Sequence, residues 1–183
     1  MNIQFANLLG EYTFIERKNL FKNADVVLYH PGHFPELNEH IINLYKEESF
    51  KKIMIPSVFN DFLKEDEYIF HNDILVDLGI PENIIYPIRG EAESANDVIK
   101  NAMLQLTNEK NILLIGKTFF MYRFLLIASA FAKEDMILDV LPLEDNRSIN
   151  KETWYLTDGG RKRVLNEYHK ISQFIKQNSQ IIF

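Results

Sequence analysis

Five short apolar runs recur along the 183-residue chain, and each is followed by a segment long enough to form a helix. The runs cover residues 25–29, 52–56, 84–88, 111–116 and 136–141. Continuous apolar strands separated by helices are typical of a parallel sheet that is buried on both faces. This order predicts an α/β protein with a three-layer, Rossmann-like fold of about five mostly parallel strands.

The segments between the runs carry apolar residues at helical spacing. The clearest is 94–106, where Ala95, Val98, Ile99, Ala102, Met103 and Leu106 share one face. Residues 1–22 are expected to form an N-terminal helical extension. Residues 150–178 are expected to form a C-terminal helical region, broken at Asp158-Gly159-Gly160, that packs on the sheet. No linker or repeat divides the chain, so a single domain over 1–183 is expected, with 143–151 as an exposed loop.

Composition excludes several classes of protein. Cysteine is absent, which excludes a disulfide scaffold, a thiol nucleophile and a thiolate metal site. The net charge of −6 argues against a nucleic-acid partner, which requires a basic surface. The most apolar stretch, 124–132, is much shorter than the roughly 20 residues of a spanning helix, and the start has no export signal. We therefore expect a cytoplasmic protein with no membrane partner.

Polar and charged residues follow each apolar run. In open parallel sheets, ligands bind beyond the carboxyl ends of the strands, so these residues are expected to gather at one edge. The candidate ligand-binding residues are Gly32, Ser57, Glu91, Glu93, Ser94, Lys117 and Arg123. Glu91, Glu93 and Arg123 are also the catalytic candidates, and the predicted partner is a small anionic molecule.

Each candidate has a structural alternative. Ser94 and Asp97 have the spacing of a helix cap, although the same helix end could also bind an anion. Glu91 and Glu93 could bind a ribose, a metal or a proton, or they could pair with nearby cations. Lys117 and Arg123 precede or begin a helix, where a cation is unfavourable without an anion nearby. That anion is expected to be either a ligand or one of the two glutamates.

The histidines suggest no metal site. His30, His33, Glu36 and His40 could in principle bind zinc, but their spacing matches no known metalloenzyme pattern, so we assign no metal and expect loop or capping roles. His71 and His169 are expected on the surface. The chain also lacks the G-x-G-x-x-G, G-x-x-x-x-G-K and G-x-S-x-G motifs, which argues against standard NAD, ATP and α/β-hydrolase sites.

Five segments together resemble the YdcF-like family, which carries the DUF218 domain. They are ADVVLYHPG, LVDLGIPENIIYP, GEAESANDVIKNA, ILLIGKTFFMYRFLLIA and WYLTDGGRKRVLNEYHKI, within about residues 24–175. The chain departs from the family pattern at Asp97, where Thr is usual, and at Phe120, near which many relatives have a His. The resemblance implies the soluble branch, for which nucleotide or S-adenosylmethionine binding has been suggested and no general reaction is established.

Three functions follow from these observations. The first is binding of a nucleotide-like or S-adenosylmethionine-like anionic molecule at the edge of the sheet. The second is catalysis on a phosphorylated or adenosyl substrate, by a hydrolase or a transferase. The third is an interaction protein with a vestigial pocket.

Overall fold

A five-stranded parallel sheet forms the middle layer of the computed structural model, which describes residues 2–47 and 49–182. Its strands are β1 (Val26–His30), β2 (Ile53–Pro56), β5 (Ile85–Ile88), β6 (Asn111–Lys117) and β7 (Ile137–Leu143). They lie in the order β5-β2-β1-β6-β7, and every neighbouring pair is parallel. The predicted Rossmann-like α/β fold is confirmed.

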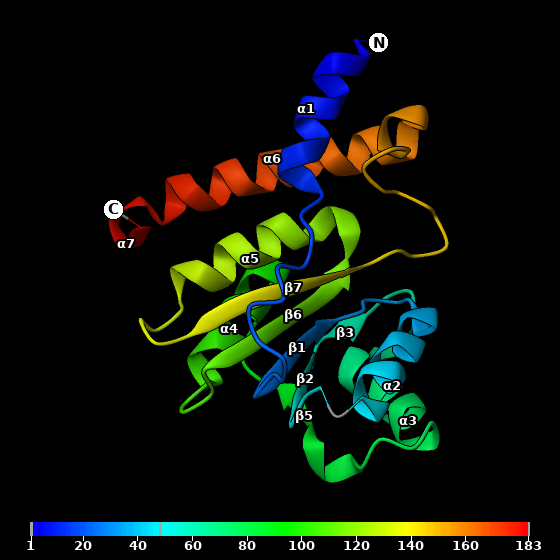
Figure 1. The fold of residues 1–183 in the computed structure, drawn as a ribbon, viewed down its shortest axis with the longest axis vertical. Helices are drawn as coiled ribbons and strands as arrows, with labels where there is room; N and C mark the ends of the chain where they lie inside the picture. Colours follow the sequence, from blue (N-terminus) through cyan, green and yellow to red (C-terminus); the bar gives the residue numbers. More distant parts are fainter. Residues whose placement is uncertain (1, 48, 183) are drawn as a thin grey trace.

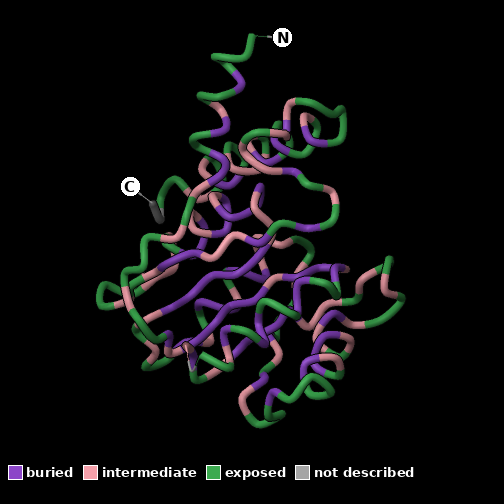
Figure 2. Tube along the Cα trace, turned by 45° about the vertical axis from the view of Figure 1, so that its right-hand side comes forward, coloured by how far each residue is buried: buried purple, intermediate pink, exposed green. Residues whose placement is uncertain are grey.

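Helices cover both faces of this sheet (Figure 1). α2 (Asn38–Lys46) and α3 (Glu67–Asp77) pack on one face, and α4 (Ala95–Gln105) and α5 (Met121–Ala130) pack on the other. The side chains of β1 alternate between the two layers: Val27 and Tyr29 join the α2–α3 core, whereas Val26 and Leu28 join the α4–α5 core. The central strands are therefore buried on both sides, which accounts for their unbroken apolar runs (Figure 2).

The C-terminal helices form an outer layer. α6 (Asp158–Gln177) lies across α5 on the side away from the sheet, and α7 (Ser179–Ile182) follows it (Figure 1). The prediction that this region packs on the sheet was therefore wrong, because α5 lies between them. The predicted break at 158–160 lies one residue earlier, at Thr157, whose extended backbone precedes a continuous helix that begins at Asp158. A short 3-10 helix, η4 (Trp154–Leu156), precedes Thr157 and buries Trp154.

The N-terminal extension is helical only at its start. α1 (Ile3–Thr13) ends well before residue 22, and the following chain runs without regular structure along the edge of the sheet. The buried Asp139 of β7 accepts hydrogen bonds from the backbone N–H groups of Lys18 (2.9 Å) and Leu20 (3.0 Å). These bonds hold the segment in a non-helical conformation, so the extension predicted over residues 1–22 is helical only over Ile3–Thr13.

Two further features differ from prediction. β3 (Phe59–Asn60) and β4 (Glu65–Asp66) form a small antiparallel hairpin that is too short to leave a pattern in the sequence. Residues 143–151 are irregular after β7, but Asp145 and Ile149 are buried, so the loop is not simply exposed. The remaining 3-10 helices are η1 (Pro35–Leu37), η2 (Glu82–Ile84) and η3 (Thr118–Phe120).

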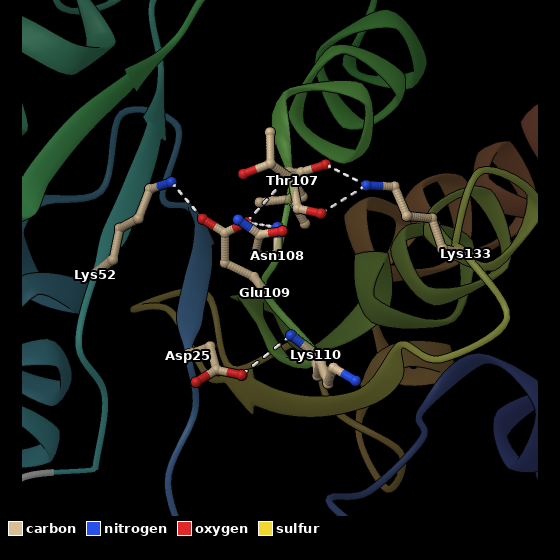
Figure 3. A network of polar contacts seen from close by, with 8 residues as sticks. Asp25, Lys52, Thr107, Asn108, Glu109, Lys110 and Lys133 are labelled. Atoms are coloured by element: carbon tan, nitrogen blue, oxygen red, sulfur yellow. Dashed lines mark hydrogen bonds and ion pairs between the residues drawn. The ribbon is translucent and has the colours of Figure 1, made fainter.

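Charged groups at the amino edge of the sheet are paired with one another (Figure 3). Glu109 accepts hydrogen bonds from Lys52 Nζ (2.8 Å) and from the Thr107 backbone (2.8 Å). Burial alone would raise the pKa of Glu109, but these hydrogen bonds outweigh it and lower the pKa to about 2. Lys133 Nζ donates to the carbonyl groups of Leu106 and Thr107. This network fixes the loop before β6.

No helix within residues 2–47 and 49–182 combines the length and apolar character needed to cross a bilayer.

Candidate functional site

A cavity of about 200 Å³ lies at the carboxyl ends of β1 and β6. The chain proceeds from β1 toward β2 and β5 on one side, and from β6 toward β7 on the other, so this is the point where the strand order reverses. Open α/β sheets bind ligands at such a point. The lining residues are His30, His33, Phe34, Ala95, Lys117, Phe119, Phe120, Arg123, Arg147, Arg163, Asn166, Glu167 and Lys170.

Positive charge dominates this cavity. Five of the lining side chains are cationic, namely Lys117, Arg123, Arg147, Arg163 and Lys170, and only Glu167 carries a carboxylate. The protein as a whole has a net charge of −6, so the charge of the cavity lining is opposite in sign to that of the protein. A cavity lined by one sign of charge attracts ligands of the opposite sign.

Arg123 forms a buried ion pair within the protein. Its Nε donates to Glu167 Oε2 at 2.5 Å and its Nη2 to Glu167 Oε1 at 3.2 Å, while Nη1 donates to Asn96 Oδ1 at 2.5 Å. Both charged partners are less than 10% exposed. Arg123 therefore has an internal partner, but the predicted pairing with Glu91 or Glu93 is wrong, because the partner is Glu167 of α6. Arg123 thus links α5 to both α6 and α4.

Aromatic rings support three of the other cations, Lys117, Arg147 and Arg163. Lys117 Nζ lies 5.0 Å and Arg147 Cζ 4.4 Å from the centre of the Phe34 ring. Arg147 Cζ and Arg163 Cζ lie 5.4 Å and 5.7 Å from the centre of the Phe119 ring. Cations at these distances are attracted to the ring faces. These two rings therefore position positive charge around the cavity.

Asp145 helps to fix Arg147. The Arg147 Nε donates to both carboxylate oxygens of Asp145 at 3.0 Å, and Nη2 makes a third contact. Although burial raises the pKa of Asp145, its hydrogen bonds with Arg147 outweigh this effect and the pKa is lowered. Asp145 is therefore ionised, and its ion pair holds the Arg147 guanidinium over the Phe34 and Phe119 rings. In contrast, Arg163 engages no ion pair within residues 2–47 and 49–182.

Gly32 makes room for Lys117. A Cβ atom at Gly32 would lie 2.8 Å from Lys117 Nζ, and the backbone there has a φ of +65°, which favours glycine. Lys117 Nζ also donates to the Pro31 carbonyl at 3.4 Å. Gly32 is not one of the lining residues, so its observed role is to shape the loop that surrounds the amine.

His71 supports the same loop from below. Its Nε2 lies 2.7 Å from the Gly32 carbonyl oxygen and its Nδ1 lies 3.1 Å from Asn38 Oδ1. The side chain is fully buried, and this desolvation lowers its pKa to about 4. The prediction that His71 is a surface residue was wrong, because its helix turns this face toward the sheet and the Gly32 loop. His169 is exposed, as predicted.

His30 and His33 belong to the cavity wall. Burial, together with the charges of Lys117 and Arg123, lowers the pKa of His30 to about 3, so its ring is neutral. His33 stacks on Phe62 of the β3–β4 turn, with ring centres 4.4 Å apart. Within the described part of the chain, no group of three or more His, Asp or Glu side chains is placed to hold a metal ion.

The remaining predicted residues lie outside the main cavity. Ser57 Oγ donates to Asp66 Oδ2 at 3.1 Å, beside the hairpin. The predicted cap at Ser94 is confirmed, because Ser94 Oγ accepts from the Asp97 N–H and Asp97 Oδ2 accepts from the Glu93 N–H. Glu93 and Ser94 line an adjoining hollow that shares Arg123 and Lys170 with the cavity. Glu91 is exposed and lines neither hollow.

Four charged residues that line the cavity were not among the predicted site residues. Arg147 follows β7 in the loop that the sequence predicts to be exposed, and Arg163, Glu167 and Lys170 lie on α6, for which the sequence predicts a packing role alone. The available signal was the spacing of these three α6 residues, at i, i+4 and i+7, which places them on one helix face. A polar stripe of this kind is also typical of a helix face in contact with solvent. The spacing alone therefore does not distinguish a ligand-binding face from a solvated one.

No family model matches the chain, and neither the curated proteins nor the solved structures contain a match.

Proposed function

We propose that this protein binds a small phosphorylated molecule in the cavity between the ends of β1 and β6. The observation that carries the proposal is the set of five cationic side chains, opposed by one carboxylate that already pairs with Arg123. Arginine and lysine form strong, charge-assisted hydrogen bonds with phosphate oxygens. Lys117 and Arg163 have no ion-pair partner among the described residues and are free to do so.

The charge of the cavity favours a phosphorylated ligand over S-adenosylmethionine. The sulfonium of that molecule is itself a cation and would face Lys117 and the arginines at close range. The volume of about 200 Å³ also favours a small ligand, because drug-sized molecules occupy pockets of about 300–1,000 Å³. A sugar phosphate meets both conditions, and a mononucleotide meets the condition of charge. Membership of the YdcF-like family, for which nucleotide binding has been suggested, is part of the same proposal.

A thermal-shift screen tests the proposal. Ribose 5-phosphate, adenosine monophosphate and inorganic phosphate should raise the melting temperature, whereas ribose, adenosine and S-adenosylmethionine should not. A ligand at 100 times its Kd adds about 2.7 kcal/mol to the free energy of unfolding. Potassium chloride at equal ionic strength controls for nonspecific screening. A rise with S-adenosylmethionine alone would overturn the choice of a phosphorylated ligand.

A pair of neighbouring residues on α6 supplies the matched variants. Arg163 lines the cavity, whereas Lys162 is exposed and does not line it. Arg163→Ala should reduce the shift produced by ribose 5-phosphate, and Lys162→Ala should leave it unchanged. Equal losses in the two variants would show that the effect is general surface electrostatics and not binding in this cavity.

A further inference from the structure

We propose that Lys117 forms an imine with the carbonyl carbon of a phosphorylated aldehyde or ketone bound in the cavity. This inference rests on the proposed function, because the phosphate group is what brings the carbonyl to the amine. It adds a covalent step and a substrate class, phosphorylated carbonyl compounds, to the binding proposed above.

The position of Lys117 is the first observation in support. The residue ends β6 and lines the cavity, and its Nζ has no carboxylate within 4.0 Å among the described residues. The hydrogen bond that Nζ donates to the Pro31 carbonyl is long, at 3.4 Å. An ammonium group held in an ion pair is a poor nucleophile, whereas this amine is free to reach a bound molecule.

The neighbouring arginines are the second observation. Lys117 Nζ and Arg147 Cζ both lie over the Phe34 ring, and Arg147 Cζ and Arg163 Cζ both lie over the Phe119 ring. A phosphate held by the two guanidinium groups would therefore lie beside the amine. A short carbon chain from that phosphate would place its carbonyl group within reach of Lys117.

The surroundings also favour the reactive, neutral form of the amine. Burial lowers the pKa of Lys117 to about 8, and the charges of Arg147 and Arg163 act in the same direction, while Glu67 and Asp145 oppose it. At pH 7, roughly a tenth of an amine with this pKa is unprotonated, far more than for an ordinary lysine. Gly32 leaves space for the Lys117 amine, because a Cβ atom at residue 32 would force Nζ to move.

The reaction is balanced without an oxidant or a reductant. The ammonium first releases a proton to solvent, and the amine nitrogen then attacks the carbonyl carbon to form the C–N bond. The carbonyl oxygen takes up a proton to give a carbinolamine. Loss of water breaks the C–O bond, and the two hydrogens of the amine leave with that oxygen. Protonation of the imine restores one positive charge beside the phosphate.

Pyridoxal 5′-phosphate, a phosphorylated aldehyde whose imines absorb visible light, is a suitable probe. The intact protein is incubated with the probe, reduced with borohydride, digested and analysed by mass spectrometry. The expected result is one dominant adduct, at Lys117, that inorganic phosphate suppresses. Pyridoxal, which lacks the phosphate, should give at least tenfold less adduct at this residue. Lys162→Met, at an exposed lysine outside the cavity, should leave the adduct unchanged.

The variant Lys117→Arg distinguishes loss of imine formation from loss of phosphate binding. This variant keeps the positive charge, so the thermal shift with inorganic phosphate should persist while the adduct disappears. If the wild-type protein binds phosphate but gives no adduct at Lys117, the imine is overturned and the proposed function stands. Equal labelling of many surface lysines by both aldehydes would also overturn it. If neither phosphate nor the probe binds, the proposed function itself fails.

Discussion

At the scale of single residues, the site depends on how Gly32 and Lys117 fit together. The positive φ of Gly32 turns the loop after β1, and the missing side chain leaves space for the lysine amine. The sequence indicated that Gly32 follows a strand, but it did not indicate that the space would be filled by a side chain 85 positions away. Contacts of this kind depend on strand order, which the local pattern does not determine.

Gly32→Ala should therefore affect both stability and the site. A non-glycine residue in this backbone region costs about 1–2 kcal/mol, and the added methyl group also displaces Lys117. Chemical denaturation should show a loss of that size, and the yield of the Lys117 adduct should fall severalfold. Gly79 provides the control, because it has a φ of +100° but nothing within 4 Å of its Cβ position. Gly79→Ala should lower stability and leave the adduct yield unchanged.

Arg123 is predicted to matter for stability, because its removal leaves Glu167 buried without a partner. Breaking a buried ion pair in this way costs about 3–5 kcal/mol. Arg123→Ala should lower the free energy of unfolding by an amount in this range in urea denaturation. Arg161→Ala removes a surface pair with Asp158 on the same outer layer and should cost about 1 kcal/mol or less. Similar losses in both variants would contradict the structural role of Arg123.

At the scale of elements, the strands were predictable and the terminal segments were not. Each of the five predicted strands lies within two residues of the observed bounds, because burial on both faces leaves an unbroken apolar run. The segment after α1 has no such signature, since its course is set by hydrogen bonds to Asp139 on a distant strand. The position of α6 over α5 also depends on tertiary packing, which the helical periodicity does not specify.

The start of α6 provides a test at this scale. A Cβ atom at Gly160 would lie 2.2 Å from the Trp154 carbonyl oxygen, whereas one at Gly159 would meet nothing within 4 Å. Gly160→Ala must therefore displace α6 from η4 and should lower the free energy of unfolding by about 2 kcal/mol or more. Gly159→Ala places a better helix former in an open position and should be neutral or stabilising by up to about 1 kcal/mol. Thermal denaturation of the two variants should give shifts of clearly different size, and equal shifts would contradict the observed contact.

Across the molecule, charged side chains are arranged differently at the two opposite edges of the sheet. The amino edge pairs its charges, as in the Lys52–Glu109 contact (Figure 3), whereas the carboxyl edge gathers cations around a cavity. The sequence predicted that polar groups would meet at the carboxyl edge, and it named Lys117 and Arg123 among the lining residues. It did not predict the contribution of α6, because a helix outside the sheet layers reaches this edge only through the packing of α5.

Buried neutral histidines should make stability depend on pH. The pKa values of His71 and His30 are lowered to about 4 and about 3, so between these values and 6.5 the unfolded chain binds protons that the folded chain does not. The free energy of unfolding should therefore fall as the pH is lowered from about 6.5 to about 4, by about 1.4 kcal/mol per pH unit for each histidine. Glu67, whose pKa is raised by burial, acts in the opposite direction.

Urea denaturation as a function of pH isolates the histidine contribution. His71→Gln should remove about one histidine's share of the slope between pH 6.5 and pH 4.5, whatever its effect on absolute stability. His169→Gln, at an exposed histidine, should leave the slope unchanged. An unaltered slope in His71→Gln would show that His71 is not held in its neutral form.

Isothermal titration of ribose 5-phosphate tests the binding of a phosphorylated molecule in the cationic cavity most directly. We predict saturable binding at one site per chain, no binding of ribose, and a loss of affinity of about 10–100-fold in Arg163→Ala, as expected for a hydrogen bond to a charged group. Lys162→Ala should bind like the wild type. Absence of saturable binding, or equal affinity in wild type and Arg163→Ala, would contradict a phosphate site in this cavity.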